Sequence, residues 1–457
     1  MQIRALEALE RQHDLFSYRV DGWSAWRVMR NPVHRMTSDL PLVQPSRPNT
    51  ARALHALAAT VKLVWLLLTA GKRDLLVKTC RSGLRMSIGK QFRDVYFDGL
   101  LQRGQSCLKL EEINSPDFNE QAAAAWRRPD LDTVVFTFWG RFLGTLFPVK
   151  AQAFCEATSH LIAQEMHLQI APRWLLMRLS TVYWQARLYS ALLRRIRPLA
   201  VLVADTGEYG LRVACYRQGV RFIELQHGVF DANHPDAIPT WVQGSTGELM
   251  LPDFLACRGE FWVAQLSDTR QGRDHAVAVG NELIDLARER MRHRALGGPL
   301  NLVLTTQGLD TQRLVDWIAD MIAKAPSDLD WRLWIKLHPV YDAKTHEYDI
   351  LKADTRVRIV GGAEQPNVFD LLADADLHLS IASACHFDAA ALGVRSMVVP
   401  LAGHEPMLEV IDETQVFLAR STADVWTVVR QPPVGAVRTH RFAKPGFIDN
   451  LQFLLSR

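Results

Sequence analysis

The chain has few of the features that mark several common protein classes. Its six cysteines are scattered over 457 residues and none belongs to a CxxC pair, so neither a disulfide framework nor a zinc site is expected. No apolar run reaches the roughly 20 residues that a membrane-spanning helix needs. The polar, helical N-terminus does not resemble a secretory signal. We therefore expect a cytoplasmic protein, either free or held peripherally on the inner face of the membrane.

Two nucleotide-binding motifs are also missing. No GxGxxG follows the first predicted strand of either half, and GxxxxGK[ST] is absent, which argues against a dinucleotide oxidoreductase and a P-loop enzyme. The 53 basic and 49 acidic residues give a net charge of +4. No dense basic run with interleaved aromatic residues occurs, so no nucleic-acid partner is expected.

Length and periodicity indicate two α/β domains. A chain of 457 residues exceeds what one hydrophobic core usually organises. Strands alternate with helices in both halves, which predicts parallel sheets with right-handed crossovers. We expect two Rossmann-like lobes whose sheets face a central cleft. The predicted division is a leader at 1–50, a first domain at 51–282, a second at 283–440 and a C-terminal helix at 441–457.

The predicted strands are short apolar runs bounded by turn residues. They fall at 74–79, 107–110, 133–138, 199–204, 221–225, 253–257, 275–280, 300–305, 331–337, 356–360, 377–380, 396–400 and 416–419.

The apolar segment 61–70 is predicted to be a core helix, with a membrane-surface element as the alternative. Basic residues lie around and after it, and they form either a solvated surface or a basic face near an anionic substrate or leaflet. They are Lys72, Arg73, Lys78, Arg81, Arg85, Lys90 and Arg93.

The stretch from 198 to 239 organises the first domain. A strand at 199–204, a helix at 208–218 closed by Gly219 and a strand at 221–225 follow one another. Polar clusters come directly after both strands. Because ligands of open α/β sheets bind beyond the carboxyl ends of the strands, these clusters are the best candidates for chemistry.

His227 is the favoured general base of this stretch. A neutral imidazole can take a proton from an acceptor hydroxyl, and Gly228 leaves room for a substrate beside it, next to Gln226. Asp205 and Glu208 are alternative bases, or could set the tautomer of His227. Their alternative roles are a helix cap for Asp205 and a favourable first-turn charge for Glu208.

The second half carries polar groups at three successive strand ends. They are Gln307, His338 with Lys336 and Pro339 beside it, and the set Ser380, Ser383 and His386. Ser383 can cap a helix beginning near Ala384, whose amides suit a phosphate, and Asp388 could bind a ribose hydroxyl pair. Ordinary capping for the serines and a structural role for the histidine are the alternatives.

Four passages resemble bacterial nucleotide-sugar-dependent glycosyltransferases of the GT-B architecture that make capsular and other surface polysaccharides. Residues 203–210 followed by IELQHGVFDANHP are similar to their acceptor-side loop. WIKLHPVYD is similar to the HP motif of sialyl-, Kdo- and glycerophosphate-transferring enzymes that use cytidine nucleotides. NVFDLLADADLHLSIASACHFDAAALGVRSMVVP resembles their donor-binding segment. HAVAVGNELID resembles the strand before their second domain, with Glu282 where a proline is usual. The resemblance spans roughly residues 70–430 in the order of elements.

The resemblance implies transfer of a sugar from a nucleotide-sugar donor to a glycan or lipid-linked acceptor, without a metal or a further cofactor. It assigns His338, Ser380, Ser383 and Asp388 to the donor nucleotide, although many relatives have glutamate at the last position. A UDP-sugar 2-epimerase, a CDP-glycerol-type glycerophosphotransferase and a non-catalytic GT-B scaffold in a polysaccharide assembly complex remain as alternatives.

Overall fold

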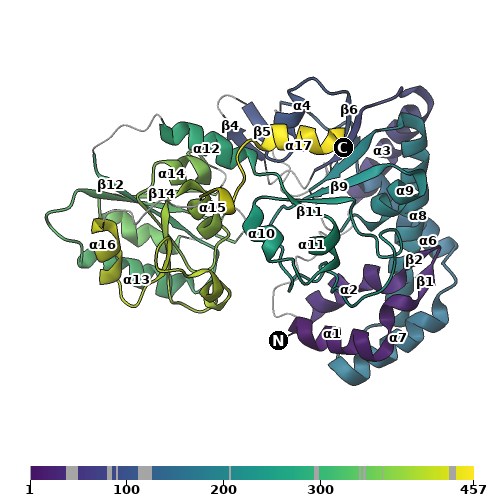
Figure 1. The fold of residues 1–457 in the computed structure, drawn as a ribbon, viewed down its shortest axis with the longest axis horizontal. Coiled ribbons are helices and arrows are strands. Elements are labelled where there is room, and N and C mark those ends of the chain that lie inside the picture. Colours follow the sequence, from purple (N-terminus) through teal and green to yellow (C-terminus); the bar gives the residue numbers. More distant parts are fainter. Residues whose placement is uncertain are drawn as a thin grey trace.

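The computed structural model has two α/β lobes side by side (Figure 1). It describes residues 2–37, 50–79, 85–88, 91–111, 126–204, 207–292, 298–338, 341–342, 346–362, 364–431 and 439–457. Each lobe is built on one parallel sheet, so the predicted fold class is confirmed.

The first lobe contains a seven-stranded parallel sheet in the order β11-β10-β9-β8-β3-β6-β7. Its strands are β3 (Leu75–Lys78), β6 (Cys107–Glu111), β7 (Leu131–Asp132), β8 (Ala200–Val203), β9 (Arg221–Leu225), β10 (Phe254–Cys257) and β11 (Ala276–Ala278). The chain builds outward from β3 through β6 to β7, then returns to the other side of β3 with β8. The direction of winding therefore switches between β3 and β8, which is where doubly wound sheets bind ligands.

The second lobe repeats this plan with six parallel strands in the order β14-β13-β12-β15-β16-β17. They are β12 (Leu300–Thr305), β13 (Trp331–Lys336), β14 (Val357–Val360), β15 (Leu377–Ser380), β16 (Arg395–Val398) and β17 (Val416–Leu418). Its switch point lies between β12 and β15.

Helices surround both sheets, and the longer ones bury an apolar face in the lobe. In the first lobe they are α3 (Thr50–Thr69), α4 (Asp98–Leu101), α6 (Val134–Leu146), α7 (Gln152–Met166), α8 (Pro172–Ile196), α9 (Tyr209–Gln218), α10 (Glu260–Ala264) and α11 (Arg270–Asp274). In the second they are α12 (Glu282–Arg292), α13 (Thr311–Ala323), α14 (Val368–Ala373), α15 (Cys385–Leu392) and α16 (Ala423–Arg430). Small elements complete the described fold: a hairpin of β1 (Arg19–Val20) and β2 (Trp23–Ser24), a hairpin of β4 (Arg85–Ile88) and β5 (Gln91–Asp94), and the 3-10 helices 15–17, 347–353, 405–410 and 439–441.

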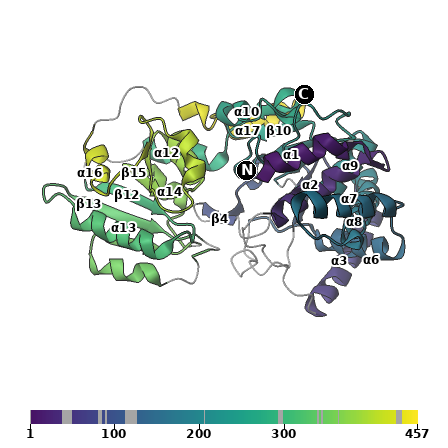
Figure 2. The same ribbon diagram turned by 90° about the horizontal axis from the view of Figure 1, so that it is seen from below.

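The N- and C-terminal segments both pack on the first lobe. Helices α1 (Gln2–His13) and α2 (Ala25–Met36) share a hydrophobic core with α7 and α8 (Figure 2). The chain crosses back from the second lobe so that α17 (Phe447–Ser456) contacts α4 and α12. Gly280 lies where the chain first passes from the first lobe to the second, and its φ is +106°. A Cβ at Gly280 would lie 2.2 Å from the carbonyl oxygen of Lys444, in the segment that returns to the first lobe. A side chain at Gly280 would therefore force the two crossings apart.

One predicted strand is a helix. Residues 133–138, with β-branched and aromatic side chains, were expected to form a strand, but they enter α6. Gly140 and Gly144 let α6 approach α8 closely, since a Cβ on Gly140 would lie 2.8 Å from Cγ of Gln185. Packing on α8 thus outweighs the local preference for a strand.

The segment 61–70 is helical as predicted, but α3 is only half a core helix. Ala56, Ala59, Leu63 and Leu66 are buried, whereas Val61 and Leu68 are each 72% exposed. No helix among the described residues has both the length and the hydropathy for crossing a membrane.

Candidate functional site

Two charged side chains meet at the switch point of the first sheet. Lys78 ends β3, Glu208 precedes α9, and the Lys78 ammonium forms an ion pair with the Glu208 carboxylate. Lys78 is buried and therefore does not belong to a solvated basic surface. Glu208 occupies the N-cap position of α9, but its side chain makes no capping bond. Asp205 lies outside the described residues.

The loop after β9 is fixed by its own side chains and by Tyr96. Buried Gln226 donates from Nε2 to the carbonyl oxygen of Gly228 at 2.9 Å and accepts at Oε1 from the amide of Arg258 at 3.0 Å. The Tyr96 hydroxyl donates to the carbonyl oxygen of His227 at 3.2 Å. The His227 side chain is half-buried beside these fixed groups.

Arginines from α2 hold the far end of the same loop. Arg27 Nη1 lies 2.5 Å from Asp236 Oδ1, and both side chains are 1% exposed. Arg30 Nη1 donates to the carbonyl oxygens of Pro235 and Ala237 at 2.6 and 2.7 Å. Burial alone would raise the pKa of Asp236, but the charge of Arg27 and hydrogen bonds to the carboxylate hold that pKa well below its usual range. Buried ion pairs and hydrogen bonds thus join the N-terminal segment to the loop that carries His227.

His234, in this loop, is a half-buried neutral imidazole. Its Nδ1 accepts from the amide of Asp236 at 3.1 Å, and its ring packs on Phe230 with centroids 4.4 Å apart. Burial lowers the pKa of His234 to about 4. Its acceptor role at Nδ1 fixes the loop backbone.

Gln307, one of the predicted site residues, connects the two loops at the switch point of the second sheet. Gln307 follows β12, and its Oε1 accepts from the amide of Ala382 at 2.9 Å, in the turn after β15. Fully buried Ser380 donates to the carbonyl oxygen of Thr305 at 2.7 Å. The Ser383 hydroxyl accepts from the amide of Cys385 at 3.2 Å, although Ala384 is the N-cap residue of α15. The hydrogen bonds of Ser380 and Ser383 are those of ordinary capping and turn residues.

His386 lies deeper, behind this turn. It is fully buried, and its Nδ1 lies 2.6 Å from the Ser396 hydroxyl, which also lies 2.7 Å from Nδ1 of His378. Burial lowers the pKa of His386 to about 4 and that of His378 well below its usual value. These two rings form part of the interior of the second lobe.

The HP dipeptide lies at the end of β13, next to the switch point. The amide of His338 donates to the Thr306 hydroxyl at 3.0 Å, and Nδ1 accepts from the amide of Tyr341 at 3.2 Å. Burial lowers the pKa of His338. With Nδ1 accepting, the proton of the neutral ring is on Nε2. Pro339 lies outside the described residues.

Lys336 at the end of β13 contacts the backbone of the loop after β14. Its Nζ donates to the carbonyl oxygens of Gly361 and Glu364 at 2.7 and 2.6 Å. Burial lowers the pKa of this ammonium group to about 8. Lys336 therefore organises the loop after β14, and a role at the donor nucleotide stays a prediction.

The carboxyl edges of the two sheets meet through Arg258 and Asp388. Arg258 follows β10, Asp388 lies on α15, and Nη1 and Oδ1 are 2.9 Å apart. Burial raises the pKa of Asp388, and the guanidinium of Arg258 opposes that rise. Phe387 packs beside the pair on Phe261 and Trp262, with ring centroids 5.6 and 4.7 Å away. Asp388, the residue predicted to bind the ribose, thus forms an ion pair with Arg258 of the first lobe.

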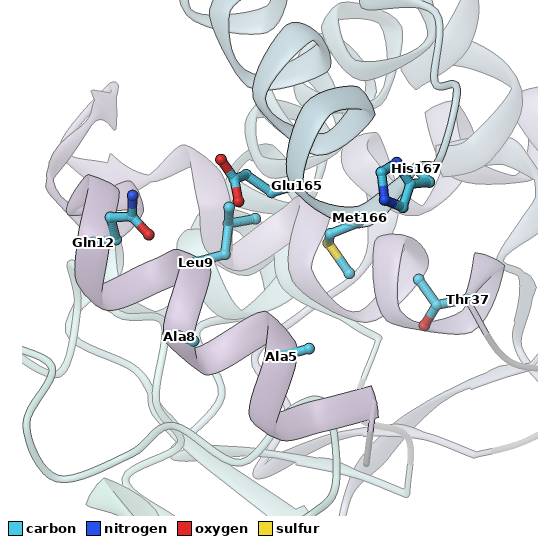
Figure 3. A pocket seen from close by; sticks show the side chains of 8 residues that line it. All are labelled: Ala5, Ala8, Leu9, Gln12, Thr37, Glu165, Met166 and His167. Carbon is cyan, nitrogen blue, oxygen red and sulfur yellow. The ribbon is translucent and has the colours of Figure 1, made fainter.

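Neither Arg258 nor Asp388 lines either of two pockets found among the described residues. The larger, of about 420 Å³, lies between α1, the end of α2 and α7 and contains none of the predicted site residues (Figure 3). The smaller, beside Tyr96, Gln226 and Glu282, offers about 10 Å³, room for about one water. Among the described residues no group of three or more His, Cys, Asp or Glu could hold a metal ion; the expectation of a metal-free site stays an expectation.

No protein-family model and no curated protein matches this chain. Three solved structures are similar to it in fold. They are UDP-GlcNAc 2-epimerase from Neisseria meningitidis bound to UDP-GlcNAc (13% identity, 84% of this chain and 100% of that one, TM-score 0.48), Acinetobacter baumannii MurG (12%, 84% and 99%, 0.46), and the wall teichoic acid polymerase TagF (11%, 90% and 97%, 0.47). At these values the likeness carries no conclusion about substrate or activity.

Sequence reasoning missed the residues that position the site. Arg27 and Arg30 are three apart in an otherwise apolar part of α2, so they share one helix face, and this spacing was the available signal. No local sequence pattern indicates Asp388 as the partner of Arg258, because the two residues are far apart in the chain.

Of the predicted basic residues, Arg93 is buried and paired with Glu282 at 3.2 Å, while Arg81 and Lys90 lie outside the described residues.

Proposed function

We propose that this protein transfers a sugar from a nucleotide-activated donor to a hydroxyl group of a surface polysaccharide or lipid-linked glycan. The observation that carries the proposal is the position of the predicted residues in the two sheets. Gln307 and the turn after Ser380 lie at the switch point of the second sheet, and Lys78 and Glu208 at that of the first. Switch points are where doubly wound sheets bind their ligands.

The donor nucleotide is proposed to bind at the second lobe. The N-terminus of α15 offers the positive end of a helix dipole to a phosphate, while the first amides of this helix donate to Ser383 and Ala384. His338, neutral with its proton on Nε2, can donate a hydrogen bond to the same phosphate group. A cytidine nucleotide is the favoured donor because of the HP dipeptide.

The acceptor hydroxyl is proposed to face the first lobe, with His227 as its base. In the transfer step the acceptor oxygen bonds to the anomeric carbon as the bond from that carbon to the donor phosphate breaks. The hydroxyl proton passes to the base, and the nucleotide leaves with the bonding electrons. Glu208 is the second candidate base. Its pairing with Lys78 holds the carboxylate in place, which favours an orienting or electrostatic role over proton transfer.

The first experiment is a thermal-unfolding panel with CMP, CDP, UDP, GDP and dTDP. A nucleotide that binds only the folded protein stabilises it by about 2.7 kcal/mol at 100 times its dissociation constant. We expect one nucleotide to raise the unfolding temperature in the wild type and less in Gln307→Ala. No shift with any nucleotide would instead favour a non-catalytic scaffold.

The reaction class is then tested with the sugar conjugate of the nucleotide that binds. Release of the free nucleotide that depends on an added glycan acceptor is the expected result. Conversion of the donor sugar without an acceptor would indicate an epimerase, and transfer of glycerophosphate from a CDP-glycerol donor would indicate a glycerophosphotransferase.

A further inference from the structure

Helix α3 lies at the periphery of the first lobe (Figure 2), and one apolar side of it is not covered by any described element. Its members recur at steps of three and four residues, so they share one side of the helix. They are Leu54, Leu57, Val61, Val64, Trp65 and Leu68, all at least half exposed. We call this set the α3 face.

The α3 face is not the side that packs on the lobe. The opposite side buries Ala56, Ala59, Leu63 and Leu66 in one hydrophobic cluster with α6 and α8. Trp139 of α6 donates from Nε1 to the Thr60 hydroxyl at 2.8 Å, which fixes how α3 lies. A helix that is apolar on both sides but covered on one leaves a surface that water solvates poorly.

The helix that bears the α3 face and the helices that support it carry basic but no acidic side chains, while buried Asp132 of β7 contacts His55 of α3 at 2.5 Å. Neither α3 nor the two helices packed against it, α6 and α8, contains any Asp or Glu. Arg195 of α8 donates from Nη2 to the carbonyl oxygen of Leu68 at 2.8 Å, so a guanidinium lies at the C-terminal end of the face. Exposed basic residues of the three helices are Lys62, Arg141, Arg173, Arg187, Arg194 and Arg195.

We propose that the α3 face docks on a lipid leaflet that contains anionic headgroups. Leu, Val and Trp side chains would enter the boundary between headgroups and acyl chains, as in amphipathic helices that lie in the plane of a membrane. Trp65 suits that depth because its ring is apolar while its N–H can still meet polar groups. Lys62 of α3 and Arg195 beside Leu68 would meet the negative surface potential, and no acidic side chain of the three helices opposes it.

This choice of occupant follows from charge. A second copy of the chain would bring the same basic helices against each other, which costs free energy through like-charge repulsion. The inference concerns attachment and does not depend on the proposed transfer reaction.

The test is co-sedimentation of the full chain with vesicles of phosphatidylcholine alone or mixed with phosphatidylglycerol. We expect binding to the mixed vesicles that weakens as salt is raised, since salt screens exposed charges. The double variant Trp65→Ser, Leu68→Ser should bind about tenfold or more weakly, because it removes apolar area that enters the membrane.

The matched control is Ile350→Ser, Phe453→Ser. Ile350 and Phe453 are 72% and 59% exposed, against 72% for Leu68 and 58% for Trp65, and neither lies on α3. This variant should bind vesicles like the wild type. Circular dichroism of both variants checks that each is folded, as expected for exposed positions.

Three results would overturn the proposal. The wild type could stay in the supernatant with both vesicle types. It could bind neutral vesicles as tightly as anionic ones, which would remove the role of the basic residues. It could form a dimer that the Trp65→Ser, Leu68→Ser variant alone dissolves, which would assign the α3 face to a second copy of the chain.

Discussion

Arg258 and Asp388 join the two lobes at the carboxyl edges of their sheets. The 2.9 Å contact between Nη1 and Oδ1 links the end of β10 to the first turn of α15. The same Arg258 donates its backbone amide to Gln226 in the loop of His227. One residue therefore connects the proposed acceptor loop with the helix proposed to receive the donor phosphate.

Arg258→Met should destabilise the protein by roughly 3 kcal/mol, because it leaves the buried Asp388 carboxylate without its counter-charge. Urea unfolding measures the loss. The control is Arg430→Met, which breaks a 2.6 Å contact of Nη2 with Oδ2 of Asp328 at the surface and should cost less than about 1 kcal/mol. Equal losses in the two variants would show that the lobe-joining pair contributes no more than a surface pair.

His227→Ala should lower kcat by roughly 10²–10⁴-fold, the usual contribution of a general base. Nucleotide affinity, measured by calorimetry, should change little because His227 lies in the other lobe from the donor. Glu208→Gln is the comparison. If Glu208→Gln lost the larger part of kcat while His227→Ala stayed active, Glu208 would be the base.

His338→Ala should weaken nucleotide binding about tenfold or more, as expected for loss of a hydrogen bond to a charged phosphate. The same calorimetric titration with His346→Ala, which removes an exposed histidine of the same lobe, serves as control. Unchanged affinity in His338→Ala would remove the HP dipeptide from the donor site and with it the preference for a cytidine nucleotide.

Asp236→Ala should destabilise the protein by roughly 3–5 kcal/mol, since the buried guanidinium of Arg27 would lose its counter-charge. The double variant Arg27→Met, Asp236→Ala should lose less than the sum of the two single variants, because it removes both charges together. Urea unfolding of the four proteins completes the cycle. Purely additive losses would contradict a direct coupling of α2 to the loop of His227.

Stability should fall as the pH drops from about 6.5 to 4. Burial lowers the pKa of His234 and His386 from 6.5 to about 4, so in this window the unfolded chain binds protons that the folded chain cannot. Each such histidine contributes about 1.4 kcal/mol per pH unit. His386→Gln should reduce the slope of unfolding free energy against pH by up to one proton, whereas His160→Gln, at an exposed position, should not. An unchanged slope in His386→Gln would contradict a neutral buried ring.

Local sequence alone determined the alternation of the fold and the placement of polar residues at strand ends. Strands such as Ala200–Val203 are short and buried on both faces, so each is a continuous apolar run that can be predicted from the local sequence. In a parallel sheet the turn that follows a strand lies at the carboxyl edge of the sheet, whichever strands are its neighbours. Gln226, Gln307 and His338 could therefore be found as candidates without coordinates.

Only the tertiary structure decided which candidates meet and which surfaces remain uncovered. Arg258 and Asp388 are separated by 130 residues, and Arg27 and Asp236 by 209, so no local periodicity contains these pairs. Residues 133–138 became helical because Gly140 and Gly144 allow close packing on α8, and the face of α3 opposite its core contacts stayed exposed because no described element packs on it. Contacts between distant segments, rather than propensity, set these outcomes.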